Sequence, residues 1–314
     1  AVLRKQIRER HNILDRLTGT GLGVRESHPD ILIQRWSRHF GLEKTEKLCR
    51  WNNRRPETVI RPYPLRISAG DYLHRLESCG TGGIPHEYNP EEFIVPSKGR
   101  RVEELPGFRE GLFSVHDPST AESVKLLDPG EGEIVLDACS APGGKTILIS
   151  GKMHGTGNIF ALDIHADRLD LVHNNVERMK MNNVTVLRAD ASLADIEQIT
   201  GIRHFNRILL DVPCTNTGVL SRRPDARWRF SKEQLERLTQ HQRSLMDNCS
   251  RFLAQDGVLV YSTCSLEPEE GPELVGNWLK DNPGYRQSAE ISLFPPESRT
   301  DGIYASAITA GRNS

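Results

Sequence analysis

The sequence predicts an α/β protein whose larger part is a mostly parallel sheet with helices on both faces. Two observations support this fold class. From about residue 120 onward, short apolar runs of strand length alternate with longer segments of helical periodicity, which is the pattern of βαβ units. The chain has 314 residues, 37% of them hydrophobic, which is enough to bury one large core and a smaller one. We therefore expect a large doubly wound domain accompanied by a smaller one.

The alternating elements can be placed along the chain. We expect strands at residues 133–139, 158–164, 184–189, 206–212 and 257–264, and helices at residues 144–153, 166–180, 231–253 and 268–280. The helix expected at 231–253 begins with a capping box, because Ser231 is followed three residues later by Gln234. Its apolar side chains fall on one stripe: Leu235, Leu238, Leu245, Met246, Cys249 and Phe252. We expect this stripe, including the Cys249 thiol, to pack in the core.

The first 115 residues differ from the rest of the chain in composition and in the pattern of apolar residues. Residues 1–55 are typical of helices interrupted near residues 19–21, and residues 56–115 are rich in Pro, Gly and Arg with short strand candidates. Residues 1–66 carry 15 Lys and Arg against 7 Asp and Glu, a net charge of +8, which leaves −9 for the rest of the chain. Basic residues of this segment include Arg4, Lys5, Arg8, Arg10, Arg35, Arg38, Arg50, Arg54 and Arg55. They can neutralise nucleic-acid phosphates, although a solvated helical surface explains the same charge.

Composition excludes several classes of protein. No run approaches the roughly 18 apolar residues that cross a membrane, and no signal peptide is visible at the start. Six cysteines are too sparse for a disulfide scaffold and lack the paired spacing of metal ligands. We therefore expect a cytoplasmic monomer with free thiols, without a metal centre and without a membrane partner.

A glycine loop follows the first strand of the expected sheet. The strand ends at Asp137, and residues 142–146 read Pro-Gly-Gly-Lys-Thr. No G-x-G-x-x-G fingerprint of a dinucleotide site is present, and a Walker A loop would need glycine where Cys139 stands. Two alternatives remain: a structural glycine turn, or a loop whose Gly143 and Gly144 allow close approach of the methionyl and ribose parts of S-adenosylmethionine.

Acidic residues end the next two strands of the expected sheet. Asp163 is placed to accept hydrogen bonds from both ribose hydroxyls of an adenosine, and Asp190 from its adenine amino group. Each acid taken singly is also an ordinary helix N-cap. Their position beyond the glycine loop favours S-adenosylmethionine as the ligand.

Two cysteines close apolar strand-like runs farther along the chain. Cys214 follows the run that ends at Asp211, and Cys264 follows the run 257–263. Strand ends in an open α/β sheet face the ligand crevice, so two thiols there are positioned for chemistry rather than for packing. A thiol at such a place can act as the nucleophile in covalent catalysis. The residues alone do not say which thiol attacks.

Four motifs together resemble those of the RsmB/Sun (Fmu) family of RNA cytosine-5 methyltransferases. They are Asp137-x-Cys139-x-Ala141-Pro142-Gly143-Gly144-Lys145-Thr146, Asp211-x-Pro213-Cys214-x-x-x-Gly218, Arg223-Pro224-Asp225-x-x-Trp228 and Ser262-Thr263-Cys264-Ser265-x-x-Pro268-Glu269-Glu270. The resemblance covers roughly residues 27–310. It implies a Rossmann-like methyltransferase domain over 116–314, a small α+β RNA-recognition-like subdomain over 26–115, and a helical segment over 1–25 that is similar to the end of a NusB-like domain.

The resemblance also implies roles for individual residues. Cys264 would be the covalent nucleophile and Cys214 would assist release of the product. Asp211 would hydrogen-bond or protonate ring nitrogen 3, and Lys145 would orient that carboxylate or lower the pKa of a thiol, although a surface lysine is the alternative. The residues expected to bind S-adenosylmethionine are Cys139, Ser140, Ala141, Pro142, Gly143, Gly144, Lys145, Asp163, Arg168, Asp190 and Asp211.

The sequence departs from the family pattern at four positions: His116 and Gly271 replace the usual Gln and Asn, and Ile303 and Tyr304 replace the two Phe residues usual in a C-terminal Asp-Gly-Phe-Phe element. A basic loop with one aromatic residue follows Cys214 and suits contacts with RNA, although an ordinary basic loop with a packed Trp is the alternative: Arg222, Arg223, Arg227, Trp228 and Arg229. We expect methyl transfer from S-adenosylmethionine to carbon 5 of a cytosine in ribosomal RNA. Transfer RNA is the alternative substrate, and a P-loop ATPase and a non-catalytic RNA-binding scaffold are the rival classes.

Overall fold

The fold divides into two compact units. The computed structural model describes residues 2–97, 99 and 101–311. The larger unit comprises residues 57–218 and 232–314, and the smaller comprises residues 1–56 together with the segment 219–231. The sequence predicts functional boundaries at residues 25 and 115, which do not coincide with these units and stay a prediction.

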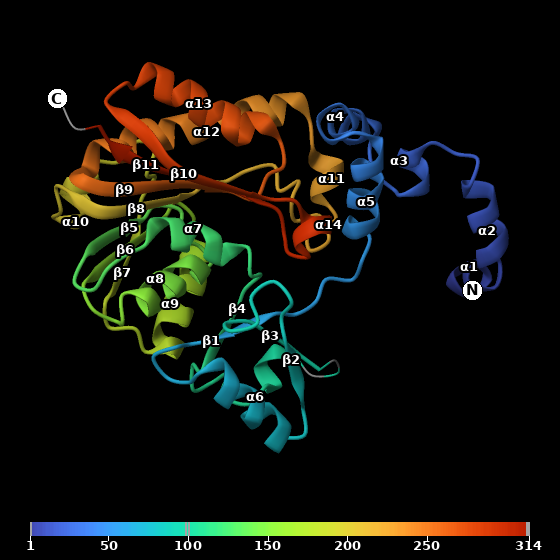
Figure 1. The fold of residues 1–314 in the computed structure, drawn as a ribbon, viewed down its shortest axis with the longest axis horizontal. Helices are drawn as coiled ribbons and strands as arrows, with labels where there is room; N and C mark the ends of the chain where they lie inside the picture. Colours follow the sequence, from blue (N-terminus) through green and yellow to red (C-terminus); the bar gives the residue numbers. More distant parts are fainter. Residues whose placement is uncertain (1, 98, 100, 312–314) are drawn as a thin grey trace. The chain divides into compact units, whose positions relative to one another are not determined.

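A seven-stranded sheet forms the centre of the larger unit (Figure 1). Its strands lie in the order β10-β11-β9-β8-β5-β6-β7. Their bounds are β5 Ile134–Asp137, β6 Asn158–Asp163, β7 Val184–Arg188, β8 Phe205–Asp211, β9 Leu253–Thr263, β10 Tyr285–Leu293 and β11 Ile303–Ala310. The pairs β5–β6, β6–β7, β5–β8 and β8–β9 are parallel, and β11 pairs antiparallel with β9 and β10. The strand order reverses between β5 and β8, so a ligand crevice is expected at the carboxyl ends of these strands.

Helices cover both faces of this sheet, as Figure 1 shows. The helices around the sheet are α7 Thr120–Leu127, α8 Gly144–Lys152, α9 Ala166–Met179, α10 Ile196–Thr200, α12 Lys232–Cys249 and α13 Pro272–Asp281. A further short helix, α14 Pro295–Ser298, connects β10 to β11. Neighbouring residues of one strand enter different cores: Leu210 packs in the cluster that contains α12 residues, and Leu209 in the cluster that contains α7 and α8 residues. The predicted doubly wound sheet is therefore confirmed.

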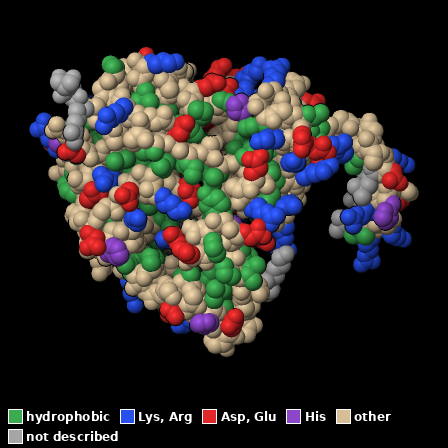
Figure 2. Space-filling model, in the orientation of Figure 1, with side chains coloured by type: hydrophobic (Ala, Val, Ile, Leu, Met, Phe, Trp, Pro, Cys, Tyr) green, Lys and Arg blue, Asp and Glu red, His purple; other side chains and the backbone are tan. Residues whose placement is uncertain are grey.

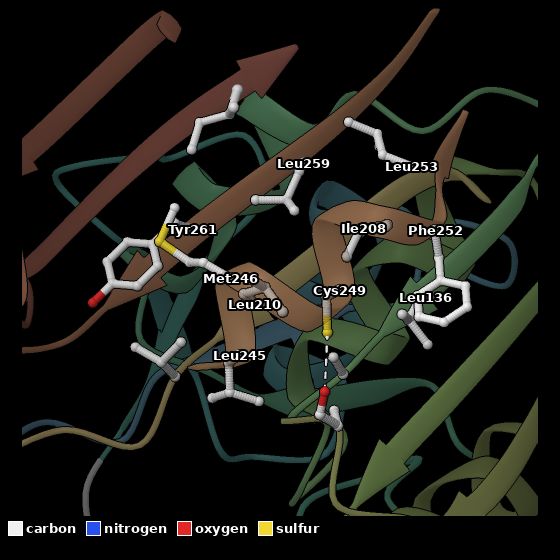
Figure 3. Packing of buried hydrophobic residues seen from close by; sticks show 14 of the residues in the cluster. Leu136, Ile208, Leu210, Leu245, Met246, Cys249, Phe252, Leu253, Leu259 and Tyr261 are labelled. Carbon is white, nitrogen blue, oxygen red and sulfur yellow. Dashed lines mark hydrogen bonds between the residues drawn. The ribbon is translucent and has the colours of Figure 1, made fainter. Parts of the chain in front are cut away.

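The core beneath α12 confirms the apolar stripe predicted from the sequence. Leu245, Met246 and Cys249 are buried against Leu210 and Tyr261 of the sheet (Figure 3). The Cys249 thiol donates a hydrogen bond to the carbonyl of Ala191, with 3.5 Å between sulfur and oxygen. Burial raises the pKa of this thiol to about 12, which suits packing rather than reactivity.

Two predicted helices have different ends in the structure. The helix expected at 231–253 ends at Cys249, and β9 begins at Leu253 after a 3-10 turn. The start of β9 is hard to recognise in the sequence because the pairing of β9 with β8 shifts its register between residues 205 and 207. The helix expected at 268–280 begins only at Pro272, after a separate 3-10 turn over Pro268–Glu270. Proline disfavours a helical conformation at the residue before it, so Gly271, with φ −126° and ψ −117°, breaks the helix.

A second, four-stranded sheet also lies in the larger unit and was expected only as short strands. Its order is β2-β3-β1-β4, and all its pairs are antiparallel. The bounds are β1 Ile60–Pro62, β2 Gly83–Pro85, β3 Ile94–Pro96 and β4 Phe113–Val115, with helix α6 over Ala69–Ser78. Tyr72, Leu76 and Phe113 pack in its small core. This sheet and helix confirm the predicted α+β subdomain.

The smaller unit is helical. It contains α1 Val2–Arg8, α2 Arg10–Leu17, α3 Leu22–Arg25, α4 Asp30–Phe40 and α5 Leu42–Asn52, and the inserted segment contributes α11 Ala226–Arg229. The break between α2 and α3 falls at residues 18–21, as the glycines predict. Figure 2 shows Lys and Arg side chains gathered around α1 and α2. No helix in the described part of the chain combines the length and apolar character needed to cross a membrane.

Candidate active site

The glycine loop connects the end of β5 to the start of α8. The main-chain N–H of Ser140 donates to the carbonyl of Leu162 at 2.8 Å, and that of Gly143 donates to the carbonyl of Ser140 at 2.7 Å. Gly143 has φ +98°, a conformation that strains other residues. A Cβ at Gly143 would also lie 3.3 Å from the Cα of Val172. Glycine is therefore required here by both conformation and close packing.

Two buried polar atoms of this loop region lack partners. Neither the Ser140 hydroxyl oxygen nor Oδ1 of Asp137 has a hydrogen-bond partner among the described residues. Oδ2 of Asp137 accepts a hydrogen bond from the Thr146 hydroxyl at 2.7 Å. Burial raises the pKa of Asp137 to about 7. Unsatisfied buried polar groups are costly, so the loop fits a polar ligand that supplies the missing bonds.

Asp163 lies at the end of β6 and is only 5% exposed. Its carboxylate accepts the main-chain N–H groups of Ala141 at 3.3 Å and His165 at 3.0 Å. Arg168 lies 3.8 Å from the same carboxylate and donates to the carbonyl of Ala141 at 2.6 Å. A carboxylate has about four acceptor positions, so Asp163 keeps capacity for the ribose hydroxyls predicted as its partners.

The remaining predicted cofactor residues are in less specific surroundings. Asp190 accepts hydrogen bonds at Oδ1 from the Ser192 main-chain N–H at 2.9 Å and from its hydroxyl at 2.6 Å, which is the turn-capping alternative. Cys139 packs against the main core, and Pro142 is exposed. The role of these residues in cofactor binding stays a prediction.

Lys145 and Asp211 form an ion pair beside the loop. Lys145 Nζ lies 2.7 Å from Asp211 Oδ2, and the lysine side chain is 13% exposed. Lys145 is in the first turn of α8 and Asp211 is the last residue of β8. This geometry excludes the alternative of an unpaired surface lysine. It also presents Asp211 as a carboxylate at the carboxyl edge of the sheet.

The two cysteines meet at the ends of adjacent strands. The Sγ atoms of Cys214 and Cys264 are 3.2 Å apart. Strands β8 and β9 are parallel with Asp211 opposite Ser262, so both thiols leave the same edge of the sheet. The pKa of the Cys264 thiol is raised well above its ordinary value by its hydrogen bond with Cys214 and by burial, while Lys145 opposes this shift. A pair that shares a proton and faces a lysine can present one sulfur as a thiolate.

Comparison with known proteins places this geometry in a family. The model described as 16S rRNA methyltransferase RsmB/F matches residues 124–309, and the model of the ferredoxin-like domain of RsmF/B-like methyltransferases matches residues 28–100. The chain belongs to the RsmB/F family. This is a family of S-adenosylmethionine-dependent methyltransferases, so S-adenosylmethionine is the cofactor of this chain. Its binding at the glycine loop stays a prediction.

Individual relatives agree with the family match. A ribosomal RNA small subunit methyltransferase B of Pseudomonas putida is 34% identical, over 95% of this chain and 68% of that protein. A probable ribosomal RNA small subunit methyltransferase B of Synechocystis is 30% identical, over 95% of this chain and 66% of that protein. The solved structure of a methyltransferase homolog protein from Pyrococcus horikoshii has a TM-score of 0.80 at 25% identity, covering 92% of this chain and 98% of that one. The chain therefore spans about two thirds of the length of these two sequence relatives.

One predicted RNA contact of this RsmB/F chain is wrong. Arg227 is 5% exposed, and its guanidinium donates to the carbonyls of Ser27 and Asn52 and to Oδ1 of Asn53, at 2.9, 3.2 and 2.9 Å. It therefore fixes the segment 219–231 within the helical unit instead of binding phosphate. Trp228 in the same segment is 63% exposed, which suits the stacking role predicted for it.

The unusual positions of the chain also have structural explanations. His116 is buried, its Nε2 lies 2.6 Å from the Ser114 hydroxyl, and its ring approaches Gly144, where a Cβ would lie 3.1 Å away. Burial is the largest cause that lowers the pKa of His116 to about 3, so the ring is neutral. Gly271 forms the break before α13, and Ile303 is a buried residue of β11.

Sequence reasoning missed the polar residues behind the thiols. Glu270, Gln242 and Tyr261 are buried and hydrogen-bonded to one another, and Glu270 entered the prediction only as part of a motif. A signal existed for Gln242, because it lies three and four residues before Leu245 and Met246 on the buried face of α12. A polar residue on an apolar stripe needs partners in the core.

Proposed function

We propose that this chain transfers a methyl group from S-adenosylmethionine to carbon 5 of a cytosine in ribosomal RNA, through a covalent bond between Cys264 and carbon 6. The observation that carries the proposal is the 3.2 Å separation of the Cys214 and Cys264 sulfurs at the edge of the sheet that also holds the glycine loop. The relatives named above, which are ribosomal RNA methyltransferases, support RNA of the ribosome over transfer RNA.

The cofactor supplies an electrophilic methyl group on a sulfonium, and the chain holds it by three kinds of contact. Gly143 lets the backbone approach the ligand, and the unpartnered Ser140 and Asp137 atoms offer hydrogen bonds. The buried Asp163 carboxylate accepts from the ribose hydroxyls. Asp190 is proposed to accept from the adenine amino group. The acidic character of these groups suits a cationic ligand.

Cys264 begins the reaction as a thiolate after its proton has left to solvent. A bond forms between its sulfur and carbon 6, and the electron pair of the carbon 5–carbon 6 double bond moves toward carbon 5 and ring nitrogen 3. Asp211, held by Lys145, accepts a hydrogen bond from nitrogen 3 as that nitrogen takes a proton from solvent. Carbon 5 then forms a bond to the methyl carbon while the bond between that carbon and the sulfonium sulfur breaks.

Cys214 completes the reaction. The Cys214 thiol first loses its own proton to solvent, and the resulting thiolate accepts the remaining proton of carbon 5. The electrons of that carbon–hydrogen bond restore the double bond to carbon 6. The bond between carbon 6 and the Cys264 sulfur breaks, so the electron pair returns to that sulfur and nitrogen 3 loses its proton. The contact between the two sulfurs supports this division of labour, because adjacent ring atoms must be reached by adjacent thiols.

RNA binding is proposed for the basic helical segment, the subdomain over 26–115 and the exposed Trp228. Arg4, Lys5, Arg8, Arg10 and Arg16 are exposed on α1 and α2. Such clusters bind phosphates without reading sequence. We propose action in the cytoplasm, and the free state of the described cysteines is compatible with a reducing compartment. The monomeric state stays a prediction.

The test compares two cysteine variants with the unchanged chain on RNA of the small ribosomal subunit. Cys264→Ala should abolish methyl transfer and form no covalent adduct, because carbon 5 is never activated. Cys214→Ala should transfer a methyl group but stall before release, so RNA should stay attached through Cys264 in denaturing electrophoresis. Full activity of both variants would overturn the proposal, and an adduct with Cys264→Ala alone would reverse the two roles.

A further inference from the structure

The two turns that carry the thiols are bonded to each other behind the sulfurs. The hydroxyl of Ser265 lies 3.0 Å from that of Thr215 and 3.2 Å from that of Thr217. The Gly218 main-chain N–H donates to the carbonyl of Cys264 at 2.9 Å, and a Cβ at Gly218 would lie 2.5 Å from that oxygen. The residues that directly follow each cysteine therefore form one polar layer.

Glu270 lies at the base of this layer and is fully buried. Its carboxylate accepts the main-chain N–H of Thr215, at 3.0 Å from Oε1 and 3.3 Å from Oε2, and it also accepts the Thr215 hydroxyl. Gln242 Nε2 donates to Oε1 at 2.9 Å. Every one of these donors is neutral, and Glu270 forms no ion pair within the described residues. The carboxylate thus serves as an acceptor for the residue directly after Cys214.

Gln242 holds the other side of the same cysteine. Its Nε2 donates to the carbonyl of Pro213 at 2.9 Å as well as to Glu270. The Tyr261 hydroxyl lies 3.1 Å from Gln242 Oε1 and 2.7 Å from the Glu270 carbonyl, so its single proton is shared between these two acceptors or donated to one of them. The main chain is therefore fixed immediately before and immediately after Cys214 by side chains from α12 and from the turn 268–270.

We propose that Glu270 is a positioning residue that holds the Cys214 thiol at the place from which it releases the product. This inference rests on the proposed function, because it assigns Cys214 the release step. Glu270 reaches no reacting atom and acts through the peptide between Cys214 and Thr215. Glu270 also accepts a hydrogen bond from the Ser265 hydroxyl, directly after Cys264, but it binds the main chain only beside Cys214. Attack of Cys264 on carbon 6 should therefore depend less on this residue.

The carboxylate is chemically specific for this position. All of its partners are donors, and a carboxylate is an acceptor only. Glu270→Gln preserves shape but places an NH₂ group opposite the Thr215 donors or opposite Gln242 Nε2. One donor is then left without its acceptor, and the turn that carries Cys214 must shift. Displacements of about 1 Å near reacting groups cost up to about a hundredfold in rate.

The first experiment measures turnover, S-adenosylmethionine affinity and trapped adduct for Glu270→Gln, with the unchanged chain, Cys214→Ala and Glu269→Gln alongside. Glu269 is a partly exposed carboxyl group of the same turn. We expect Glu270→Gln to lower turnover about tenfold or more, to leave cofactor affinity unchanged and to accumulate methylated RNA bound through Cys264. Glu269→Gln should behave as the unchanged chain. Lower turnover without trapped adduct, while Cys214→Ala does trap it, would overturn the inference.

The second experiment does not depend on catalysis. Iodoacetamide alkylation of Cys214 is followed in a Cys264→Ala background, and that of Cys264 in a Cys214→Ala background, each with and without Glu270→Gln. We expect Glu270→Gln to change the alkylation rate of Cys214 at least threefold and that of Cys264 by less. Equal changes at both thiols, or none, would overturn the inference even if Cys214 proved not to be the release residue. Gln242→Met, which removes the bond to Pro213, should act in the same direction and replaces Glu270→Gln if that variant does not fold.

Discussion

Two consecutive segments of this chain are each fixed by a buried ion, but by ions of opposite sign in different units. The turn 214–218 of the larger unit is held by the Glu270 carboxylate, which collects N–H and hydroxyl donors. The segment 219–231 belongs to the smaller unit and is held by the Arg227 guanidinium, which collects carbonyl acceptors. The comparison shows that the sign of a buried ion selects which backbone groups it can fix. An opposite charge is not needed when enough neutral partners are present.

The largest effect is expected when the buried cation, the Arg227 guanidinium, is removed. Arg227→Leu removes three hydrogen bonds and leaves the carbonyls of Ser27 and of the buried Asn52 without this donor. We expect a loss of about 3 kcal/mol in the stability of the helical unit, from bonds of roughly 1–3 kcal/mol each when one partner is charged. Hydrogen exchange of α4 and α5 measures it. The larger unit should keep its affinity for S-adenosylmethionine.

Arg229→Met is the matched control for Arg227→Leu. Arg229 lies two residues away, and its 60% exposed side chain pairs with Asp225 at 2.7 Å. An exposed ion pair of this kind contributes at most about 1 kcal/mol. A comparable loss of protection in both variants would show that the segment, and not the buried ion, stabilises the unit.

The next largest effect is expected when the pH is lowered, and it should fall on the helical unit that contains Arg227. His28 is buried near Arg227, with Nδ1 2.6 Å from the Glu26 carbonyl and Nε2 3.2 Å from Asn52 Nδ2, so the neutral ring donates at one nitrogen and accepts at the other. Burial, followed by the charge of Arg227, lowers the pKa of His28 from 6.5 to about 4. A lowered folded-state pKa stabilises the fold above pH 6.5, and that stability is lost as pH falls toward 4.

We expect His28 to cost the helical unit at most about 3 kcal/mol over this pH range, since one pKa unit corresponds to about 1.4 kcal/mol. Comparing the pH dependence of exchange protection in His28→Asn and in the unchanged chain isolates the contribution. Identical slopes in the two proteins between pH 6.5 and 4 would contradict it. The turn held by Glu270 should respond with the opposite sign, because burial raises the pKa of the Glu270 carboxyl above its ordinary value of 4.5 and protonation as pH falls therefore favours the folded state.

A smaller effect is expected for another buried carboxylate of the larger unit, the one proposed to bind the cofactor. Asp163→Ala removes an acceptor proposed for two ribose hydroxyls, and we expect S-adenosylmethionine to bind about thirtyfold more weakly, which corresponds to about 2 kcal/mol. Isothermal calorimetry measures the affinity. Asp167→Ala, an exposed residue of the first turn of α9, is the control and should bind normally. Unchanged affinity in Asp163→Ala would remove this residue from the site.

The smallest expected effect concerns exposed charge. Arg54 and Arg55 are exposed near the end of the helical unit, and the Arg54 guanidinium lies 5.1 Å from the Trp51 ring centre. Reversing both charges should weaken RNA binding and reduce the slope of log affinity against log salt by about 0.7–0.9 for each phosphate that is no longer neutralised. Arg50 is less suitable because it already pairs with Glu46 at 2.6 Å. An unchanged slope would mean that the two arginines are merely solvated.

The sequence predicted well wherever one local pattern decides the structure. The parallel strands were placed because apolar runs alternate with helical periodicity, and Asp163, Cys214 and Cys264 were placed because they end such runs. The antiparallel β10 and β11 were missed, since β10 is largely exposed and β11 consists mostly of small residues, so neither shows a strong alternation. Arg227 and Glu270 were misjudged or overlooked because their partners are distant in sequence: Ser27 is 200 residues from Arg227. The helix and strand propensities of individual residues carry no information about contacts between residues so far apart in the sequence.

The parallel pairing of β8 and β9 sets a length scale for the chemistry. Neighbouring strands in a sheet are about 4.8 Å apart, and this spacing is fixed by backbone hydrogen bonds rather than by side chains. Two thiols that leave adjacent strand ends, 50 residues apart in sequence, are therefore brought near one another by the sheet itself. Any two reactive side chains at these two positions would therefore be close enough to contact two adjacent atoms of the same planar ring. The spacing of the strands would thus allow other pairs of side chains at these positions to act together on two adjacent atoms of an aromatic base.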